Sequence, residues 1–161
     1  MTSFDKPSDD KDEPKLSDVE ASALRILAGR PHAQGELERK LRKRDYPDEL
    51  IAEVCRRMRE FGYLDDEQFA EDQAAILKRK GWGPRQIGYK LGNTGLDDVV
   101  VDEAIANLGS ARDWQEACRE RVRSKYRCEP GELDFDGRKK AFRHLKYRGF
   151  RESTIRRVLF D

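Results

Sequence analysis

Three pairs of adjacent carboxylates are the first candidates for chemistry in this sequence. They are Asp48-Glu49, Asp65-Asp66 and Asp97-Asp98. Closely spaced carboxylates can hold a divalent cation or act as general acid and general base. Each pair, however, stands where the pattern predicts that a helix begins, and acidic side chains there cap free amides and complement the helix dipole. Helix capping therefore explains all three pairs, with a metal or acid–base role as the alternative.

The histidines and cysteines form no recognisable metal-binding or nucleophilic motif. His32 and His144 lie in basic stretches that we expect to be exposed, and Cys55, Cys118 and Cys128 have no CxxC spacing. An odd number of cysteines without such spacing fits reduced, structural thiols in a reducing cytosol. We therefore expect no metal, no cofactor and no catalytic site, and we interpret the chain as a binding protein and not as an enzyme.

A glycine-rich segment, Gly81-Trp82-Gly83-Pro84, could in principle surround a phosphate group. It lacks the GxxxxGK[ST] pattern of a phosphate loop, and no strand is predicted before it. We interpret the segment as a tight turn between two helices, with Trp82 packed across it.

Basic side chains gather in three clusters. These are Arg39, Lys40, Arg42, Lys43 and Arg44; Lys78, Arg79, Lys80 and Arg85; and Lys139, Lys140, Arg143, Lys146, Arg148 and Arg151. The third cluster lies within residues 119–161, which carry 14 basic and 7 acidic side chains, although the whole chain has a net charge of +1. Such a surface could neutralise nucleic-acid phosphates or dock on an acidic protein groove. A solvated helix face is the simpler alternative, and the nearby aromatic residues Phe142, Tyr147 and Phe150 fit a core better than a base-stacking platform.

An apolar pattern that occurs three times indicates how these side chains are positioned. Leu41, Leu91 and Leu145 each follow another apolar residue by four positions, and they are separated by 50 and then 54 residues. The positions 5, 10 and 13 residues after each leucine are again apolar or aromatic: Tyr46, Ile51 and Val54; Leu96, Val101 and Ala104; Phe150, Ile155 and Val158. One supersecondary unit is therefore repeated, and because so small a unit has a thin core, we expect neighbouring units to share buried surface.

The predicted architecture is all-α, with three tandem three-helix repeats that form an elongated, curved array. The nine helices are expected to begin near Ser17, Gln34, Pro47, Asp66, Pro84, Asp98, Ser110, Gly137 and Glu152. Apolar positions recur with the helical period throughout, and no segment alternates as a strand does. The predicted divisions are a disordered acidic tail at residues 1–16, repeats at 17–64 and 65–109, and a basic third repeat at 110–161.

The composition fits a thin array better than a compact sphere, since 40% of the residues are charged and 37% are hydrophobic. The polar first residues contain no apolar segment typical of a signal peptide. No apolar run approaches the about 20 residues that a membrane helix requires. We therefore expect a cytoplasmic protein without a membrane segment, and we expect a monomer.

Two consecutive blocks resemble the RecX family of bacterial recombination regulators. The first block is GYLDDEQFA at residues 62–70, and the second is KGWGPRQI at residues 80–87, followed by Leu91. Residues 23–28 with Leu37 and Leu41 are similar to the first unit of that family, and His144-Leu145, residues 148–150 and Ile155 to the last. The resemblance covers about residues 19–161. It departs at residues 92–95, GNTG, where the family more often has a charged, helix-favouring residue before the turn glycine.

This resemblance implies three tandem three-helix repeats and a protein that binds the RecA recombinase filament on DNA. It further implies inhibition of strand exchange and of the filament ATPase, by insertion into the helical groove and by blocked extension or promoted disassembly. It implies no catalytic residue. As candidates for contact with the filament or with single- or double-stranded DNA, we select Arg79, Lys80, Arg85, Lys90, Lys139, Lys140, Arg143, Lys146, Arg148 and Arg151.

Two other functions remain open from the residues alone. Three-helix units with short turns are similar to helix-turn-helix modules, so the chain could be a direct DNA-binding regulator. It could also be a helical-repeat scaffold for other proteins.

Overall fold

The computed structural model describes residues 12–161, and within this range the chain is entirely helical. Its elements are α1 (Leu16–Gly29), α2 (Gln34–Arg42), α3 (Asp48–Glu60), α4 (Asp66–Arg79), α5 (Pro84–Gly92), α6 (Asp98–Ala106), α7 (Ala111–Tyr126), the 3₁₀ helix η1 (Pro130–Glu132), α8 (Phe135–Tyr147) and α9 (Glu152–Leu159). Most of the predicted acidic tail at residues 1–16 lies outside the described residues, although its last residue, Leu16, already begins α1.

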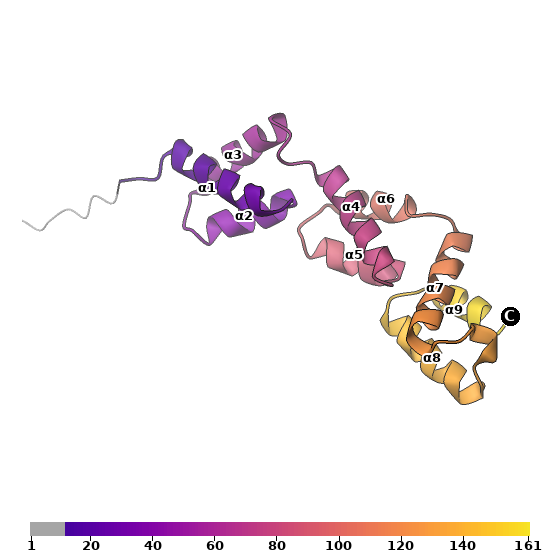
Figure 1. Ribbon diagram of the computed structural model, residues 1–161. Coiled ribbons are helices and arrows are strands. Elements are labelled where there is room, and N and C mark those ends of the chain that lie inside the picture. The colour runs from indigo at the N-terminus through magenta and orange to yellow at the C-terminus, as the bar shows by residue number, and fades with distance from the viewer. Residues whose placement is uncertain (1–11) are drawn as a thin grey trace, which may run out of the picture.

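Three groups of three helices follow one another along an extended molecule (Figure 1). We refer to α1–α3 as repeat 1, to α4–α6 as repeat 2 and to α7–α9 as repeat 3. Within each repeat the third helix packs against the other two. The predicted all-α array of three tandem repeats is thus confirmed, whereas the exact residue divisions between repeats stay a prediction.

The repeated apolar pattern forms the cores of the three repeats. Leu41, Leu91 and Leu145 are each at most 1% exposed. Their partners one helical turn earlier, in the second helix of each repeat, are completely buried as well. Tyr46 is an exception, because it is only half-buried at a position where repeats 2 and 3 bury Leu96 and Phe150.

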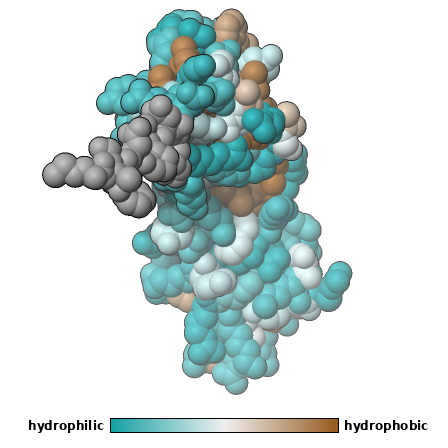
Figure 2. Space-filling model, turned by 90° about the vertical axis from the view of Figure 1, so that its left-hand side faces the viewer, coloured by the Kyte–Doolittle hydropathy of each residue, from teal (hydrophilic) through white to brown (hydrophobic). Residues whose placement is uncertain are grey.

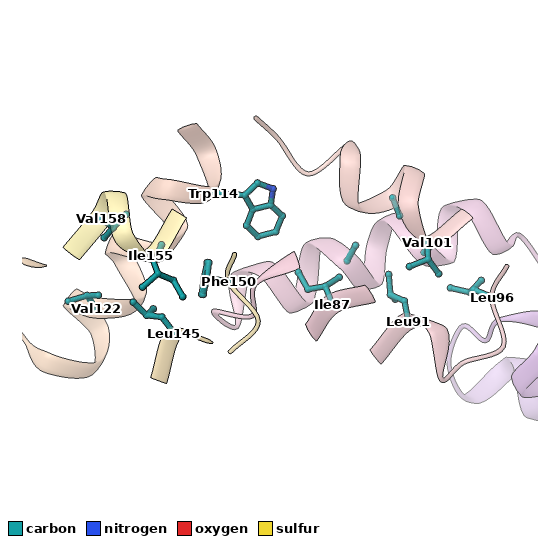
Figure 3. Packing of buried hydrophobic residues seen from close by; sticks show 14 of the residues in the cluster. Ile87, Leu91, Leu96, Val101, Trp114, Val122, Leu145, Phe150, Ile155 and Val158 are labelled. Carbon is teal, nitrogen blue, oxygen red and sulfur yellow. The ribbon is translucent and has the colours of Figure 1, made fainter. Parts of the chain in front are cut away.

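Within residues 12–161 the buried apolar residues divide into two clusters, and not into three. One cluster lies within repeat 1, and the other extends continuously through repeats 2 and 3. Figure 3 shows Phe150 and Trp114 of repeat 3 on the side of their core that faces Ile87 of repeat 2. Phe150 and Trp114 pack edge to face, with their ring centroids 6.5 Å apart. Ala33 is the repeat 1 residue that joins the second cluster.

Short backbone contacts hold repeats 2 and 3 together. The Gly83 amide donates a hydrogen bond of 2.8 Å to the Arg148 carbonyl, and the Arg85 amide donates one of 3.0 Å to the Gly149 carbonyl. A Cβ atom on Gly83 would lie 2.3 Å from the Phe150 nitrogen, so the approach requires glycine there. The glycine-rich turn is therefore a joint between repeats as well as a turn between helices.

Polar side chains hold repeats 1 and 2 together. The Gln34 amide donates to the Asp66 carboxylate at 2.8 Å, and the Arg39 guanidinium donates to the Asn93 carbonyl at 2.8 Å. Gly35 and Gly95 touch through their backbones at the same joint. This joint contains little apolar surface, so it differs in kind from the joint between repeats 2 and 3.

Two helices begin one or two residues earlier than predicted. α1 begins before Ser17, and the Asp18 carboxylate instead accepts a hydrogen bond of 2.9 Å from the Lys15 amide. α8 begins at Phe135, before the predicted Gly137, because the Asp134 side chain accepts from the Gly137 amide at 2.7 Å and caps the helix. α5 and α2 both contain 9 residues, so the GNTG departure does not shorten α5 relative to its counterpart.

Candidate functional site

All three acidic pairs lie where a helix begins, as predicted, but among them only Asp65 makes a side-chain cap. The Asp65 carboxylate accepts from the Gln68 amide at 3.0 Å and caps α4. Asp66 joins two repeats through Gln34, as described above. Within residues 12–161, no group of three or more histidine, cysteine or carboxylate side chains could hold a metal ion. Burial raises the pKa of the Cys55 thiol to about 11 and that of Cys118 to about 12, so both thiols stay protonated.

The expectation that both histidines are exposed is wrong. His32 is only 3% exposed, and its ring is held between the Arg30 carbonyl and the Lys40 ammonium group, each at 2.8 Å. His144 is half-buried on α8. Both rings are covered when the helices pack, which the basic character of their sequence neighbours does not reveal.

The structure distributes the ten basic candidate residues over several places on repeats 2 and 3. Arg79, Lys80 and Arg148 meet at the joint between the two repeats. Arg85 and Arg151 line a shallow hollow beside Asp102. Lys90 lies over the Trp82 ring, and Lys139 and Arg143 line a hollow on repeat 3. Lys140 is exposed, and Lys146 pairs with Glu152 at 3.7 Å.

A cleft of about 550 Å³ lies between the end of α4 and the middle of α7, and we call it the junction cleft. It is lined by Lys78, Arg79, Lys80 and Gly81 on one side and by Ala117, Glu120, Arg121 and Ser124 on the other. Lys78 is engaged in the fold, since its ammonium group donates to the Leu108 carbonyl at 2.6 Å and lies over the Trp114 ring.

Arg121 is a residue of this cleft that sequence reasoning did not single out. Its Nε atom donates a hydrogen bond of 3.0 Å to Nε2 of His144. A guanidinium has no acceptor, so Nε2 must be unprotonated and the His144 ring neutral. Burial and the positive charges of Lys125, Arg121 and Arg148 lower the pKa of His144 to about 4.

The cations of the junction cleft have no ionic partners among residues 12–161. Arg79, Lys80 and Arg121 form no ion pair there, and Glu120, the acidic lining residue, lies 3.5 Å from Arg123 on the same helix. Some arginines elsewhere are paired. Arg56 pairs with Glu53 and Glu60, and Arg123 pairs with Glu116 at 2.8 Å and with Glu129 at 2.7 Å. Arg79, Lys80 and Arg121 thus bring three positive charges without ion pairs to one cleft at the joint of repeats 2 and 3.

Arg148 has a structural role at this joint. Its guanidinium donates to the Gly81 carbonyl at 3.0 Å and to the Lys80 carbonyl, and it lies 3.5 Å above the centroid of the Trp82 ring. The Lys90 ammonium group also lies over the Trp82 ring, 4.3 Å from the ring centroid. The tryptophan therefore packs across the turn, as predicted, and two cations contact its ring.

A second hollow, of about 370 Å³, opens on repeat 3 and combines apolar and basic side chains. Phe142 and Phe160 form its apolar part, and Lys139, Arg143 and Arg156 surround them. Phe160 is 45% exposed, and nearby Phe135, under the Lys139 ammonium group, is 67% exposed. Exposed aromatic rings within a basic rim are typical of a protein-binding surface.

Figure 2 shows the end of the molecule that carries repeat 1, where hydrophilic side chains cover most of the surface. No helix of residues 12–161 is both long enough and apolar enough to cross a bilayer.

Comparison with known proteins identifies relatives over nearly the whole chain. Residues 21–58 match the family model described as RecX, first three-helix domain, and residues 65–105 match RecX, second three-helix domain. A protein named Regulatory protein RecX from Ectopseudomonas mendocina (strain ymp) is 40% identical over 143 residues, covering 88% of this chain and 92% of the relative. Another of that name, from Chlorobaculum tepidum, is 38% identical over 149 residues, covering 92% of this chain and 90% of the relative.

Two solved structures share the fold. The crystal structure of RecX from Lactobacillus salivarius superimposes with a TM-score of 0.77 at 21% identity, covering 89% of this chain and 94% of the other. A crystal structure of regulatory protein RecX gives a TM-score of 0.78 at 17% identity, covering 91% of this chain and 73% of the other.

Proposed function

This chain belongs to the RecX family of regulatory proteins, a family of regulators and not of enzymes, and we propose that it binds the RecA recombinase filament on DNA and inhibits its ATPase and strand-exchange activities. In this role it modulates recombination and DNA repair as a cytoplasmic monomer. The observation that carries the proposal is the placement of two different binding features on adjoining repeats of an extended array. These features are the unpaired cations of the junction cleft and the aromatic, basic hollow of repeat 3.

An extended array is suited to a polymeric target. Several repeats can contact successive subunits of a filament at once, and contacts that are weak individually then add to a high overall affinity. The rigid joint between repeats 2 and 3 fixes the spacing of the junction cleft and the hollow, which lowers the entropic cost of engaging both. A filament groove with protein walls and bound DNA offers partners for both features.

Inhibition of the RecA ATPase on single-stranded DNA tests this proposal. The hydrolysis rate is measured while this protein is titrated in, at a low and at a higher salt concentration. We expect inhibition that weakens as salt rises, because exposed charge pairs are screened. A pull-down from a bacterial lysate that retains no recombinase would instead support a general scaffold.

Charge reversal in the hollow of repeat 3 locates the protein contact. The variant Lys139→Glu with Arg143→Glu should inhibit the ATPase about tenfold less strongly, equivalent to about 1.4 kcal/mol of binding free energy. The matched control, Arg25→Glu with Lys43→Glu, changes the same charge at exposed positions of repeat 1. Equal inhibition by both variants, with unchanged helical circular dichroism, would exclude the hollow as a contact.

Direct regulation of a DNA site is the second candidate function, and the unpaired cations of the junction cleft are the observation that favours it. A gel-shift experiment without recombinase distinguishes the two. Binding to duplex DNA with a sequence preference would favour a DNA-site regulator, whereas sequence-independent binding agrees with a filament regulator.

A further inference from the structure

We propose that the junction cleft binds phosphodiester groups of a nucleic-acid strand, with Arg121, Lys80 and Arg79 as the phosphate contacts. The inference names the nucleic-acid contact of the filament regulator, so in biological terms it rests on the proposed function. It assigns a role to Arg121, which lies outside the three basic clusters that the sequence displays.

The first argument is the charge of the cleft. Arg79, Lys80 and Arg121 converge from two helices of different repeats and lack ionic partners within residues 12–161. Like charges that line the same cleft repel one another, and salt screens this repulsion only partly. In repeat 1, by comparison, Arg57 pairs with Glu20 at 3.0 Å. An arrangement of unpaired cations is stabilised when an anion binds among them.

The second argument is the chemistry of the lining. Ala117 is the apolar side chain that lines the junction cleft, and the remaining lining residues are charged, polar or glycine. The centre of a protein interface is usually apolar with aromatic anchors, a description that fits the hollow at Phe142 and Phe160 and not the junction cleft. Phosphate groups are recognised by closely spaced cations. The junction cleft is therefore better suited to phosphate than to an acidic protein surface.

The third argument is the shape of the cleft and what adjoins it. Gly81 lines it without a side chain, at a φ angle of +81°, and the Arg121 side chain crosses it so closely that a Cβ atom there would lie 2.9 Å from Arg121 Cδ. Next to Gly81 in the chain is Trp82, and the Tyr147 ring lies 6.5 Å from the Trp82 ring and is 70% exposed. An exposed aromatic ring beside a row of cations is the arrangement that binds a single strand by stacking and charge together.

The hydrogen bond between Arg121 and His144 couples phosphate binding to protonation of the His144 ring. The charged groups that act on the His144 ring are Arg121 and Lys125 of α7 and Arg148 after α8, whereas Glu152 and Arg156 of α9 pair with each other. A bound phosphate would offset the three cations and favour protonation of His144. Protonated Nε2 can no longer accept from Arg121, so the guanidinium becomes free to contact the phosphate.

Binding of a fluorescein-labelled single-stranded oligothymidylate to the full chain, measured by anisotropy without recombinase, tests the assignment. The variant Lys80→Gln with Arg121→Gln should bind at least about tenfold more weakly. The slope of log affinity against log salt should decrease by about 1.4, or about 0.7 for each phosphate of the single strand that the variant no longer neutralises. The control, Arg112→Gln with Arg127→Gln, removes the same charge from exposed positions at the two ends of α7, outside the cleft lining, and should leave the slope unchanged.

Competitors identify the source of the anion. Inorganic phosphate at the same concentration of phosphate groups should displace little oligonucleotide, since one anion cannot span the cleft. Polyglutamate should displace the oligonucleotide equally well from wild type and from the Lys80/Arg121 variant. Strong displacement by inorganic phosphate would mean that the cleft binds a single anion and not a strand. Displacement by polyglutamate that depends on Arg121 would mean that the cleft binds an acidic protein. Either result would overturn the proposal.

The pH profile gives a readout that a purely structural role would not change. Oligonucleotide affinity should rise several-fold between about pH 7.5 and about pH 5.5, because the complex takes up a proton that the free protein does not. His144→Gln should remove this rise while retaining an acceptor for Arg121. A wild-type profile as flat as that of His144→Gln would contradict the proton coupling.

The ATPase assay separates failure of the cleft assignment from failure of the proposed function. If oligonucleotide binding depends on Arg121 but the protein does not inhibit recombinase, the assignment of the cleft stands and the proposed regulatory function is refuted. If the protein inhibits recombinase but the two double variants have equal salt slopes, the proposed regulatory function stands and the assignment of the cleft is refuted.

Discussion

His144 is half-buried and lies beside three cations, and its unusual pKa follows from its burial and from these charges. Burial and the charges of Lys125, Arg121 and Arg148 lower its pKa from 6.5 to about 4. His32, which burial also affects most, has its pKa lowered as well, and the carbonyl of Arg30 partly opposes that change. Both rings therefore fold in the neutral state near neutral pH, whereas in the unfolded chain they take up protons below about pH 6.5.

Stability should consequently decrease as pH falls from about 7 to about 4. In this window the unfolded chain binds more protons at His144 than the folded protein does, so acidification favours unfolding. Urea unfolding at several pH values measures the effect. His144→Gln should reduce the slope of unfolding free energy against pH, and His32→Gln should reduce it by a smaller amount. A slope identical in wild type and His144→Gln would show that the His144 ring is not held neutral by the fold.

Residue-level features could be predicted from the sequence only where they depend on neighbours along the chain. The role of Asp65 as a helix cap was predictable, since it depends on Gln68 three residues later. The contact of Arg121 with His144 was not, because it forms when α7 packs against α8. Ion pairs between distant parts of the chain likewise depend on how the helices pack. Arg57 meets Glu20, 37 residues earlier in the chain, because α3 packs against α1.

At the scale of elements, the turn between the second and third helices of each repeat requires one residue with positive φ. The residues are Asp45 at +60°, Gly95 at +83° and Gly149 at +92°, each four positions after the repeated leucine. Gly95 and Gly149 touch the backbone of the preceding repeat, whereas Asp45 has no repeat before it and can carry a side chain. The same turn thus serves as a joint wherever a repeat precedes it.

Alanine substitution should separate the strain of this turn from the closeness of the joint. Gly62→Ala introduces a side chain at φ of +77° with nothing within 4 Å, so it should cost about 1 kcal/mol of unfolding free energy. Gly149→Ala adds the same strain and also places a Cβ atom 2.4 Å from the Gln86 nitrogen, so it should cost about 1–3 kcal/mol more. Urea unfolding measures both variants. Equal losses would mean that the joint between repeats 2 and 3 is loose enough to move.

The helix order was readable from the apolar period, and two helix starts were not. α8 begins at Phe135, which is exposed and lies outside the apolar stripe that starts at Ala141, so the period gives no signal for its first turn. α1 begins at Leu16 after Lys15, a residue type that is not a preferred cap, and Asp18 supplies the capping contact from inside the helix.

At the scale of the whole molecule, the three similar repeats form two mechanical blocks. The sequence predicted that neighbouring repeats share buried surface, and this is confirmed for repeats 2 and 3, which have one continuous apolar cluster. Repeat 1 has its own cluster and contributes only Ala33 to its neighbour. A repeat period read from the sequence does not reveal this difference, because the apolar pattern is the same in all three units while the joints depend on Gly35, Gly83 and the residues opposite them.

Two core substitutions at equivalent positions should therefore spread differently along the chain. Leu41→Ala and Leu145→Ala each empty a completely buried site, and each should cost about 2–5 kcal/mol locally. In an array, destabilisation propagates through the apolar interfaces between repeats. Hydrogen exchange should show faster exchange confined to α1–α3 for Leu41→Ala, and faster exchange in both α4–α6 and α7–α9 for Leu145→Ala. Uniform acceleration over all described helices by either variant would mean that the polar joint between repeats 1 and 2 couples them as tightly as a shared core. The three repeats would then form one mechanical block, and not a coupled pair joined to a separate first repeat.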